Sequence, residues 1–137
     1  MSDPQILASR ILIIDDEPVN VELLEQILQR EGFHQVISTT EPDRALEIYR
    51  AVQPQLVLLD LRMPRVDGFS LLTAFAEHRP VDQFVPVVIL TADVTREARH
   101  RALALGATDF LTKPLDTVEV VLRLWNLLET SVLYRRL

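Results

Sequence analysis

The sequence predicts an α/β domain with a doubly wound, five-stranded parallel sheet. Short, continuous apolar runs are typical of strands that are buried on both faces. These runs alternate with longer stretches of helical periodicity, and such alternation builds right-handed βαβ units. The chain has 137 residues, of which 48% are hydrophobic, so it can form one domain with a substantial core.

The first strand is predicted over 11–14 and the first helix over 19–30. Apolar residues recur at helical spacing in that helix, and Gly32 ends it. A weaker second strand follows over 35–38. The second helix is predicted over 40–51, because a polar cap and an early proline begin it.

The third strand, predicted over 56–60, is the most apolar one. The next segment, 62–68, is expected to be irregular because it contains Pro64 and Gly68. A helix with inward-facing leucines and a phenylalanine follows it and ends before Pro80.

The fourth strand is predicted over 87–90 and the fourth helix over 95–105, which Gly106 closes. The fifth strand, 109–112, leads into a long helix that begins near Asp116. The alternation of five strands and five helices therefore accounts for nearly the whole chain.

Composition excludes several classes of protein. The net charge of −6 argues against general nucleic-acid binding through a basic face. The absence of cysteine excludes disulfides and thiolate metal sites and is compatible with a reducing cytoplasm. Because we find neither a secretory signal nor a membrane-length apolar run, we expect a cytoplasmic protein with no membrane partner.

Reactive polar residues stand at the ends of four predicted strands. Asp15 and Asp16 follow the first strand, Asp60 ends the third, Thr91 follows the fourth and Lys113 follows the fifth. Ligands of open parallel sheets bind at the carboxyl ends of the strands. Three carboxylates, a hydroxyl and an ammonium at that edge would suit a divalent cation and a phosphoryl group.

Each of these residues also has an alternative interpretation. Asp15 and Asp16 could cap the next helix, where negative charge is favourable. Asp60 could be an ordinary solvated acid, Thr91 a common strand residue and Lys113 an exposed lysine at a turn. The matching positions of the other groups favour metal binding, with Asp60 as a carboxylate nucleophile towards phosphorus.

The final helix carries two apolar stripes, although a surface helix needs only one. The stripe expected to pack on the sheet consists of Val118, Val121, Leu122, Trp125 and Leu128. The second stripe consists of Val120, Leu124 and Leu127. Either the buried face is wide, or the second stripe contacts another protein.

Taken together, these motifs resemble the receiver domain of two-component response regulators. The segments that carry the resemblance are IIDDEP (13–18), LLDLRMPRVDG (58–68), LTA (90–92) and GATDFLTKP (106–114). The resemblance implies a flavodoxin-like (βα)5 fold with strand order 2-1-3-4-5. The implied organisation is a tail over 1–8, a receiver domain over 9–128, and over 129–137 a helical extension or a linker to an output domain.

The resemblance also implies a role for each site residue. Asp60 accepts the phosphoryl group, and Mg²⁺ (or Mn²⁺) binds Asp16 directly, Asp15 through water, Asp60, and the backbone carbonyl of Arg62. The implied phosphoryl-binding residues are Thr91, Ala92 and Lys113. Thr91 and Phe110 form the switch, and the Lys113–Pro114 peptide bond is cis. Arg62 and Asp93 flank the phosphoryl group and tune its lifetime, as an ion pair or as two independent side chains.

The implied partners are a histidine kinase or phosphotransfer protein and, through the fourth helix, fifth strand and last helix, a second copy or an output domain. The last helix resembles the linker helices of regulators that carry HD-GYP phosphodiesterase or other outputs. We expect a regulatory domain rather than an enzyme. Two alternatives are a phosphatase of the haloacid-dehalogenase type, against which Arg62 argues because that family needs a second Asp there, and a receiver-like module that is not phosphorylated.

Overall fold

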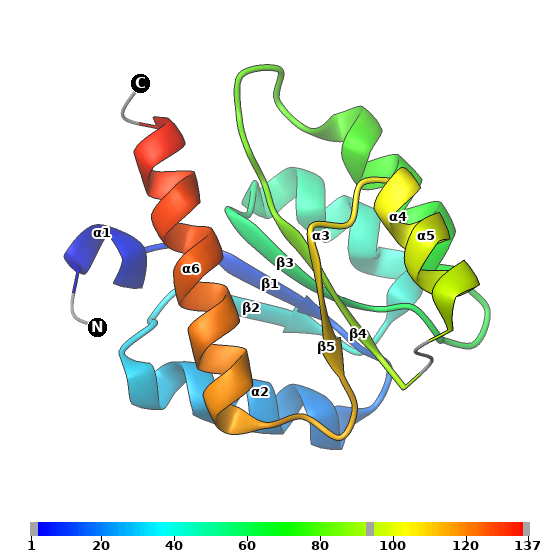
Figure 1. Ribbon diagram of the computed structural model, residues 1–137, viewed down its shortest axis with the longest axis horizontal. Coiled ribbons are helices and arrows are strands. Elements are labelled where there is room, and N and C mark those ends of the chain that lie inside the picture. Colours follow the sequence, from blue (N-terminus) through cyan, green and yellow to red (C-terminus); the bar gives the residue numbers. More distant parts are fainter. Residues whose placement is uncertain (1–2, 93–94, 136–137) are drawn as a thin grey trace.

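The computed structural model describes residues 3–92 and 95–135, in which five strands alternate with helices (Figure 1). The strands are β1 (Ile11–Ile14), β2 (Val36–Thr39), β3 (Leu56–Asp60), β4 (Val87–Thr91) and β5 (Asp109–Thr112). The helices are α1 (Pro4–Leu7), α2 (Pro18–Glu31), α3 (Ala45–Val52), α4 (Gly68–His78), α5 (Arg96–Ala104) and α6 (Thr117–Arg135). One 3-10 turn, Pro42–Arg44, precedes α3, because Pro42 begins the helical segment earlier than the regular α-helix.

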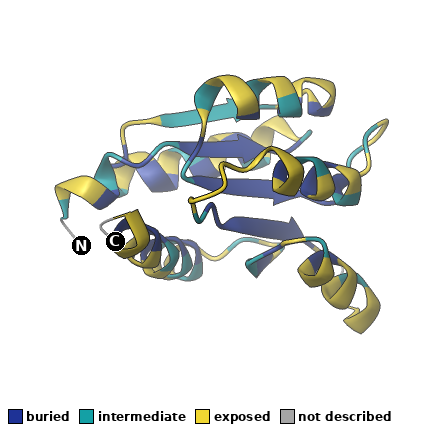
Figure 2. Ribbon diagram, turned by 90° about the horizontal axis from the view of Figure 1, so that it is seen from above, coloured by how far each residue is buried: buried dark blue, intermediate teal, exposed yellow. Residues whose placement is uncertain are grey.

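The strands form one parallel sheet in the order β2-β1-β3-β4-β5, which confirms the predicted topology. Residues of β1 and β3 are almost entirely buried, as expected of strands that helices cover on both faces. In Figure 2 these strands lie in the middle of the molecule, and the exposed residues lie on the outer sides of the helices.

Each face of the sheet has its own hydrophobic core. One core joins alternate strand residues such as Ile13 and Leu58 to α2 and α6. The other joins Leu12, Leu59 and their neighbours to α3, α4 and α5. Since side chains alternate across a strand, the two cores use different residues of the same runs.

Local signals set the ends of most helices. Gly32 and Gly106 adopt positive φ values of 101° and 114°, the left-handed conformation that favours glycine after a helix. Asp67 and Thr95 cap α4 and α5, accepting hydrogen bonds from the backbone N–H groups of Phe69 and Ala98. These are residues at which the sequence predicted helix boundaries or irregular backbone.

The predicted orientation of the last helix is wrong in part. Val120 and Leu124, assigned to the partner stripe, are fully buried against the sheet. Val118 and Leu122, assigned to the sheet, are 65% and 46% exposed. Trp125 and Leu128 are buried as predicted, so the buried face includes residues of both stripes. Apolar residues cover much of the circumference of α6, so periodicity alone did not determine which side would face the sheet.

The segment before residue 9, which the sequence predicts as a tail, contains the one-turn helix α1. Asp3 caps α1 by accepting from the N–H of Gln5, and Pro4 stands in its first turn. Ile6 is buried in the core beneath α6. The helix forms because burial of this side chain offsets the cost of ordering a single turn.

The last turns of α6, in the segment predicted as an extension, are packed against the domain. Ser131 and Val132 are buried, and the Ser131 hydroxyl donates to the carbonyl of Phe84. The ring of Tyr134 contacts that of Phe84 edge-on, with centroids 6.4 Å apart. The extension is therefore part of the folded unit. No helix within residues 3–92 and 95–135 is both long and apolar enough to span a membrane.

Candidate functional site

The register of the parallel sheet brings the predicted acids together. Ile14 pairs with Leu59, so the next residues along the two strands, Asp15 and Asp60, lie side by side at the carboxyl edge. Asp16 follows directly. Carboxylate oxygens of these three acids all lie within 4.8 Å of one another. The structure thus gathers the three residues that the sequence predicted as metal ligands.

The acid cluster has the chemistry of a divalent-cation site. Asp15 is fully buried and Asp60 is 4% exposed, so water screens their charges poorly. The Oδ1 atom of Asp15 accepts from the N–H of Glu17, whereas its buried Oδ2 atom accepts no hydrogen bond. A buried carboxylate oxygen with an unused lone pair, beside two further carboxylates, fits a hard cation such as Mg²⁺ or Mn²⁺.

Lys113 places its ammonium group between two of the acids. Its Nζ atom lies 3.2 Å from Oδ2 of Asp15 and 3.3 Å from Oδ2 of Asp60. The first contact is an ion pair, and Oδ2 of Asp15 accepts no hydrogen bond. Lys113 therefore compensates part of the buried negative charge and leaves a lone pair on Asp15 available to a metal.

The electrostatics of the cluster are visible in two pKa shifts. Burial raises the pKa of Asp60 from 3.8 to about 6, the N–H of Arg62 lowers it, and the charges of Asp15 and Lys113 act in opposite directions. For Lys113, burial lowers the pKa, but the two carboxylates raise it by more, so the net shift is upward. At neutral pH the Asp60 carboxylate is thus mostly ionised, in an environment short of positive charge.

The segment after Asp60 forms a tightly closed loop. The backbone N–H of Arg62 donates to Oδ1 of Asp60 at 3.1 Å, and Arg62 makes an antiparallel bridge with Asp67. The N–H of Gly68 donates to the carbonyl of Leu61. The loop is therefore tied to the end of β3 at both of its ends, which holds the backbone of Arg62 beside the acid cluster.

Gly68 is expected to be necessary for this closure. A Cβ atom at this position would lie 2.6 Å from the Cα of Leu61 and 2.7 Å from its carbonyl oxygen. Backbone cannot move aside cheaply, so Gly68→Ala should lower the free energy of unfolding by about 1–3 kcal/mol. Urea denaturation checks this value. As a control, Ala74→Gly in the middle of α4 should cost about 1 kcal/mol through helix propensity alone, and equal stability of Gly68→Ala and wild type would contradict the prediction.

The remaining predicted residues lie around the same edge. Thr91 is buried at the end of β4, and its carbonyl accepts from the N–H of Lys113. Ala92 follows at the surface. Phe110 is 8% exposed and packs in the core beneath α3, α4 and α5. The Lys113–Pro114 bond is cis, the geometry that the resemblance implies. Asp93, the predicted partner of Arg62, lies outside the described residues.

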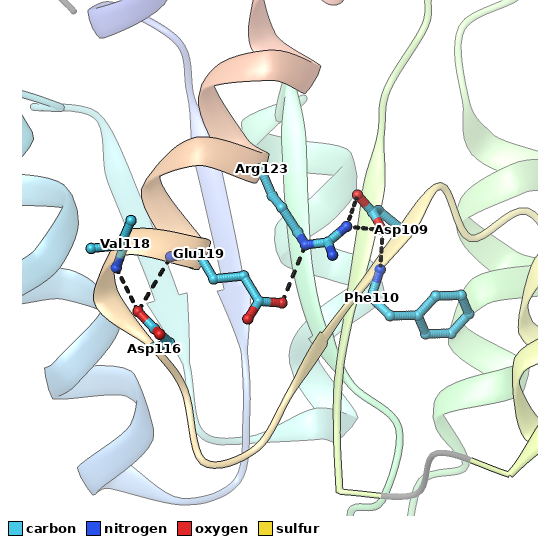
Figure 3. A network of polar contacts seen from close by, with 6 residues as sticks. All are labelled: Asp109, Phe110, Asp116, Val118, Glu119 and Arg123. Atoms are coloured by element: carbon cyan, nitrogen blue, oxygen red, sulfur yellow. Dashed lines mark hydrogen bonds and ion pairs between the residues drawn. The ribbon is translucent and has the colours of Figure 1, made fainter.

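A network that the sequence did not predict links β5 to α6 (Figure 3). Nη1 of Arg123 donates to both carboxylate oxygens of Asp109 at 2.8 Å, and its Nε donates to Glu119. Asp109 also accepts from the N–H of Phe110. The pairing of Glu119 with Arg123 is visible as an i, i+4 spacing on a helix. No local pattern identifies the partner of Arg123 across 14 residues.

Comparison with known proteins identifies the family. The family model of the response regulator receiver domain matches residues 11–124. This chain is a member of that family. The receiver fold, the order of its strands and the acid cluster all agree with this membership, which replaces the alternative of a haloacid-dehalogenase-type phosphatase. Receivers of this family work with histidine kinases and output domains.

Relatives of this receiver belong to longer regulators. Response regulator PleD of Caulobacter vibrioides is 37% identical over 121 residues, which cover 88% of this chain and 26% of PleD. The probable transcriptional regulatory protein TcrX of Mycobacterium tuberculosis is 35% identical over 121 residues, covering 88% of this chain and 50% of TcrX. The chain thus spans half or less of the length of these two relatives.

Solved structures show the same architecture. NtrX from Brucella abortus is 34% identical, with a TM-score of 0.83, and the match covers 94% of this chain and 28% of that one. The receiver domain of the sensor histidine kinase PA1611 from Pseudomonas aeruginosa is 26% identical, with a TM-score of 0.78, covering 89% and 98% of the two chains. That structure contains a magnesium ion coordinated in its active-site cleft.

Proposed function

We propose that this receiver is a phosphorylation-controlled switch in which Asp60 accepts a phosphoryl group. The observation that carries the proposal is the buried cluster of Asp15, Asp16 and Asp60 with Lys113 in contact with two of its members. A carboxylate oxygen of Asp60 attacks phosphorus, the bond between phosphorus and the donor breaks, and the leaving group departs with the bonding electron pair. The donor is the phosphohistidine of a histidine kinase or phosphotransfer protein, or a small acyl phosphate.

A divalent cation, Mg²⁺ or Mn²⁺, would be held by Asp15, Asp16, Asp60 and the backbone carbonyl of Arg62. When bound, the cation offsets the charge that the phosphoryl group brings to an already negative site. The unused lone pair on Oδ2 of Asp15 supports this assignment, as does the magnesium ion in the related PA1611 receiver. The chain's own residues orient Asp60 through the N–H of Arg62 and supply one cation, Lys113.

Phosphorylation is transmitted through Thr91 and Phe110 in this proposal. Thr91, with Ala92 and Lys113, binds the phosphoryl oxygens, and the phosphoryl group shifts the population of the switch towards the arrangement that it binds better. Phe110 lies on β5 between α5 and α6, so the surface α5-β5-α6 would change shape. Arg62 and Asp93 would tune the lifetime of the phosphoryl group. The domain regulates through its own phosphorylation and dephosphorylation and does not act on external substrates.

The test of the acceptor is incubation with acetyl phosphate and Mg²⁺, followed by intact-mass analysis. Wild type should gain the mass of one phosphoryl group, and peptide mapping should place it on Asp60. Asp60→Asn, and wild type with EDTA in place of Mg²⁺, should gain none. Absence of the gain in wild type would favour a receiver-like module that is not phosphorylated, and turnover of external phosphate esters would favour an enzyme.

The α5-β5-α6 surface should mediate association of two copies of the domain after phosphorylation. The alternative partner of this surface is an output domain. Val118 and Leu122 expose apolar surface on α6 next to the charged network of Asp109, Glu119 and Arg123. Sedimentation velocity with Mg²⁺ and beryllofluoride should show a dimer, and without beryllofluoride a monomer. Leu122→Glu should keep the beryllofluoride-bound form monomeric, and equal sedimentation of wild type in both conditions would argue against the dimer.

A further inference from the structure

Arg101 of α5 contacts the beginning of α4, next to the loop of the metal site. α4 and α5 lie side by side (Figure 1). The guanidinium carbon of Arg101 lies 4.0 Å from the centroid of the Phe69 ring, and its Nη2 atom lies 3.9 Å from Oδ2 of Asp67. Asp67 and Phe69 belong to the N-terminal cap and first turn of α4.

The contact spans a cleft. A space of about 220 Å³ separates the loop after β3 from α5, lined by Leu61, Arg62, Asp67, Phe69, Ala98 and Arg101. Side chains do not fill this space, so van der Waals contacts there do little to fix the distance between the loop and α5. The stacking of Arg101 on Phe69 joins these walls across the opening.

The loop is stiff between this contact and the acid cluster. Asp67 is bridged to Arg62, and its Oδ1 accepts from the N–H of Phe69. Arg62 in turn donates its N–H to Asp60, and Gly68 packs on Leu61 too closely to allow a Cβ. A displacement of Phe69 would therefore pass through Asp67 to the backbone of Arg62.

We propose that Arg101 is a positioning residue that couples cation binding at the Arg62 loop to the position of α5, by stacking on Phe69. The inference rests on the proposed metal site. It adds a second connection between the acid cluster and α5, separate from the connection through Thr91 and Phe110. Coupling of this kind is reciprocal, so a bound cation steadies α5 as much as the stacked Arg101 steadies the cation site.

The stacking carries the effect, because the ion pair is too long and too exposed to contribute much. The side chains of Arg101 and Asp67 are 61% and 52% exposed. An Arg stacked on an aromatic ring at such a site is expected to change an equilibrium by about two- to fivefold. Loss of the stack removes one restraint on the loop at Phe69, and the cation must then fix the loop more fully on binding, which weakens the affinity.

The experiment uses variants that keep the net charge, because removal of a positive charge near the site would itself strengthen cation binding. Arg101→Lys keeps the charge but replaces the flat guanidinium over the ring with a strongly hydrated ammonium, and Phe69→Leu keeps apolar volume and loses the ring. Phe69→Tyr keeps the ring. Arg96→Lys is the matched control on the same helix, and Arg96 lines a different cleft.

Mg²⁺ affinity is measured by calorimetry on each protein. Arg101→Lys and Phe69→Leu should each bind Mg²⁺ about two- to fivefold more weakly than wild type. Their double variant should be no weaker than either single variant, since both remove the same interaction. Phe69→Tyr and Arg96→Lys should bind like wild type. Unchanged affinity of Arg101→Lys, or additive losses in the double variant, would overturn the coupling.

Hydrogen exchange on the metal-free proteins separates this inference from the proposed function. In EDTA, peptides that cover 61–69 should exchange faster in Arg101→Lys and Phe69→Leu than in wild type or Arg96→Lys. Unchanged exchange overturns the positioning role. If wild-type protein binds no Mg²⁺, the proposed metal site fails, and the exchange result still decides whether Arg101 holds the loop.

Discussion

Asp60→Asn should raise the free energy of unfolding of the metal-free protein at pH 7.5 by about 2–3 kcal/mol. Burial raises the pKa of Asp60 in the folded protein to about 6, above its ordinary value of 3.8. The folded state therefore binds the proton more tightly than the unfolded state. Above pH 6 the ionised carboxylate destabilises the fold, and asparagine removes that charge while keeping the shape of the side chain.

The pH dependence of this difference has a definite sign. As the pH falls through about 6, Asp60 takes up its proton in the folded wild type, so wild type gains stability relative to the variant. The difference in free energy of unfolding between Asp60→Asn and wild type should be small near pH 4, where folded wild type carries a protonated Asp60. Urea denaturation in EDTA at several pH values measures it.

Two controls accompany the Asp60 measurement. Asp82→Asn removes an exposed carboxylate from the segment between α4 and β4 and should change stability by no more than about 0.5 kcal/mol. Saturating Mg²⁺ should stabilise wild type more than Asp60→Asn, which narrows the difference. A variant that is less stable than wild type at pH 7.5 in EDTA, or a difference that does not vary with pH, would falsify the electrostatic account of the site.

Lys113→Met should lower the free energy of unfolding by about 3 kcal/mol at pH 7.5 in EDTA. The ammonium contacts both Asp15 and Asp60, and the variant leaves these buried carboxylates without their cationic neighbour. Methionine keeps most of the length of the side chain, so the change in packing is small. Lys113→Arg retains the charge and should stay within about 1 kcal/mol of wild type.

Two measurements, the effect of Mg²⁺ and the effect of a second substitution, distinguish the loss of the Lys113 charge from a packing defect. Saturating Mg²⁺ should restore much of the stability of Lys113→Met, because a divalent cation supplies the missing positive charge. In the Asp60→Asn background, Lys113→Met should cost less than in wild type, because one of the repelling carboxylates is gone. A cost that neither Mg²⁺ nor Asp60→Asn reduces would indicate that Lys113 acts through packing.

The cluster could be predicted because its members obey a local rule. Asp15, Asp60, Thr91 and Lys113 each stand at the end of a short apolar run, and parallel strands bring such ends to one edge. The contacts of Lys113 with the two carboxylates follow from that placement. The distances among the groups, and the unused lone pair on Asp15, required the structure.

Other features depend on packing between distant segments. The side of α6 that faces the sheet was predicted only in part, because both candidate stripes are apolar and the buried face includes residues of each. Arg123 pairs with Asp109 on one side of the helix, and Ile6 of α1 is buried in the core beneath it. Both contacts depend on the observed orientation of α6. Asp109 and Ile6 are both distant in sequence from the residues of α6 that they contact. The stacking of Arg101 on Phe69 is of the same kind, because it joins separate helices across a cleft.

By itself, the sequence determined the parallel fold, the order of its elements and the identity of the polar residues at the carboxyl edge of the sheet. Hydrophobic periodicity and the effects of glycine and proline involve only a few neighbouring residues, so a single sequence is enough to recognise them. The tertiary structure alone decided the rotation of α6, the docking of α1 and the contact of Arg101 with Phe69. Such features are set by the total packing and charge pairing of segments that meet only in the folded state, which no local pattern encodes.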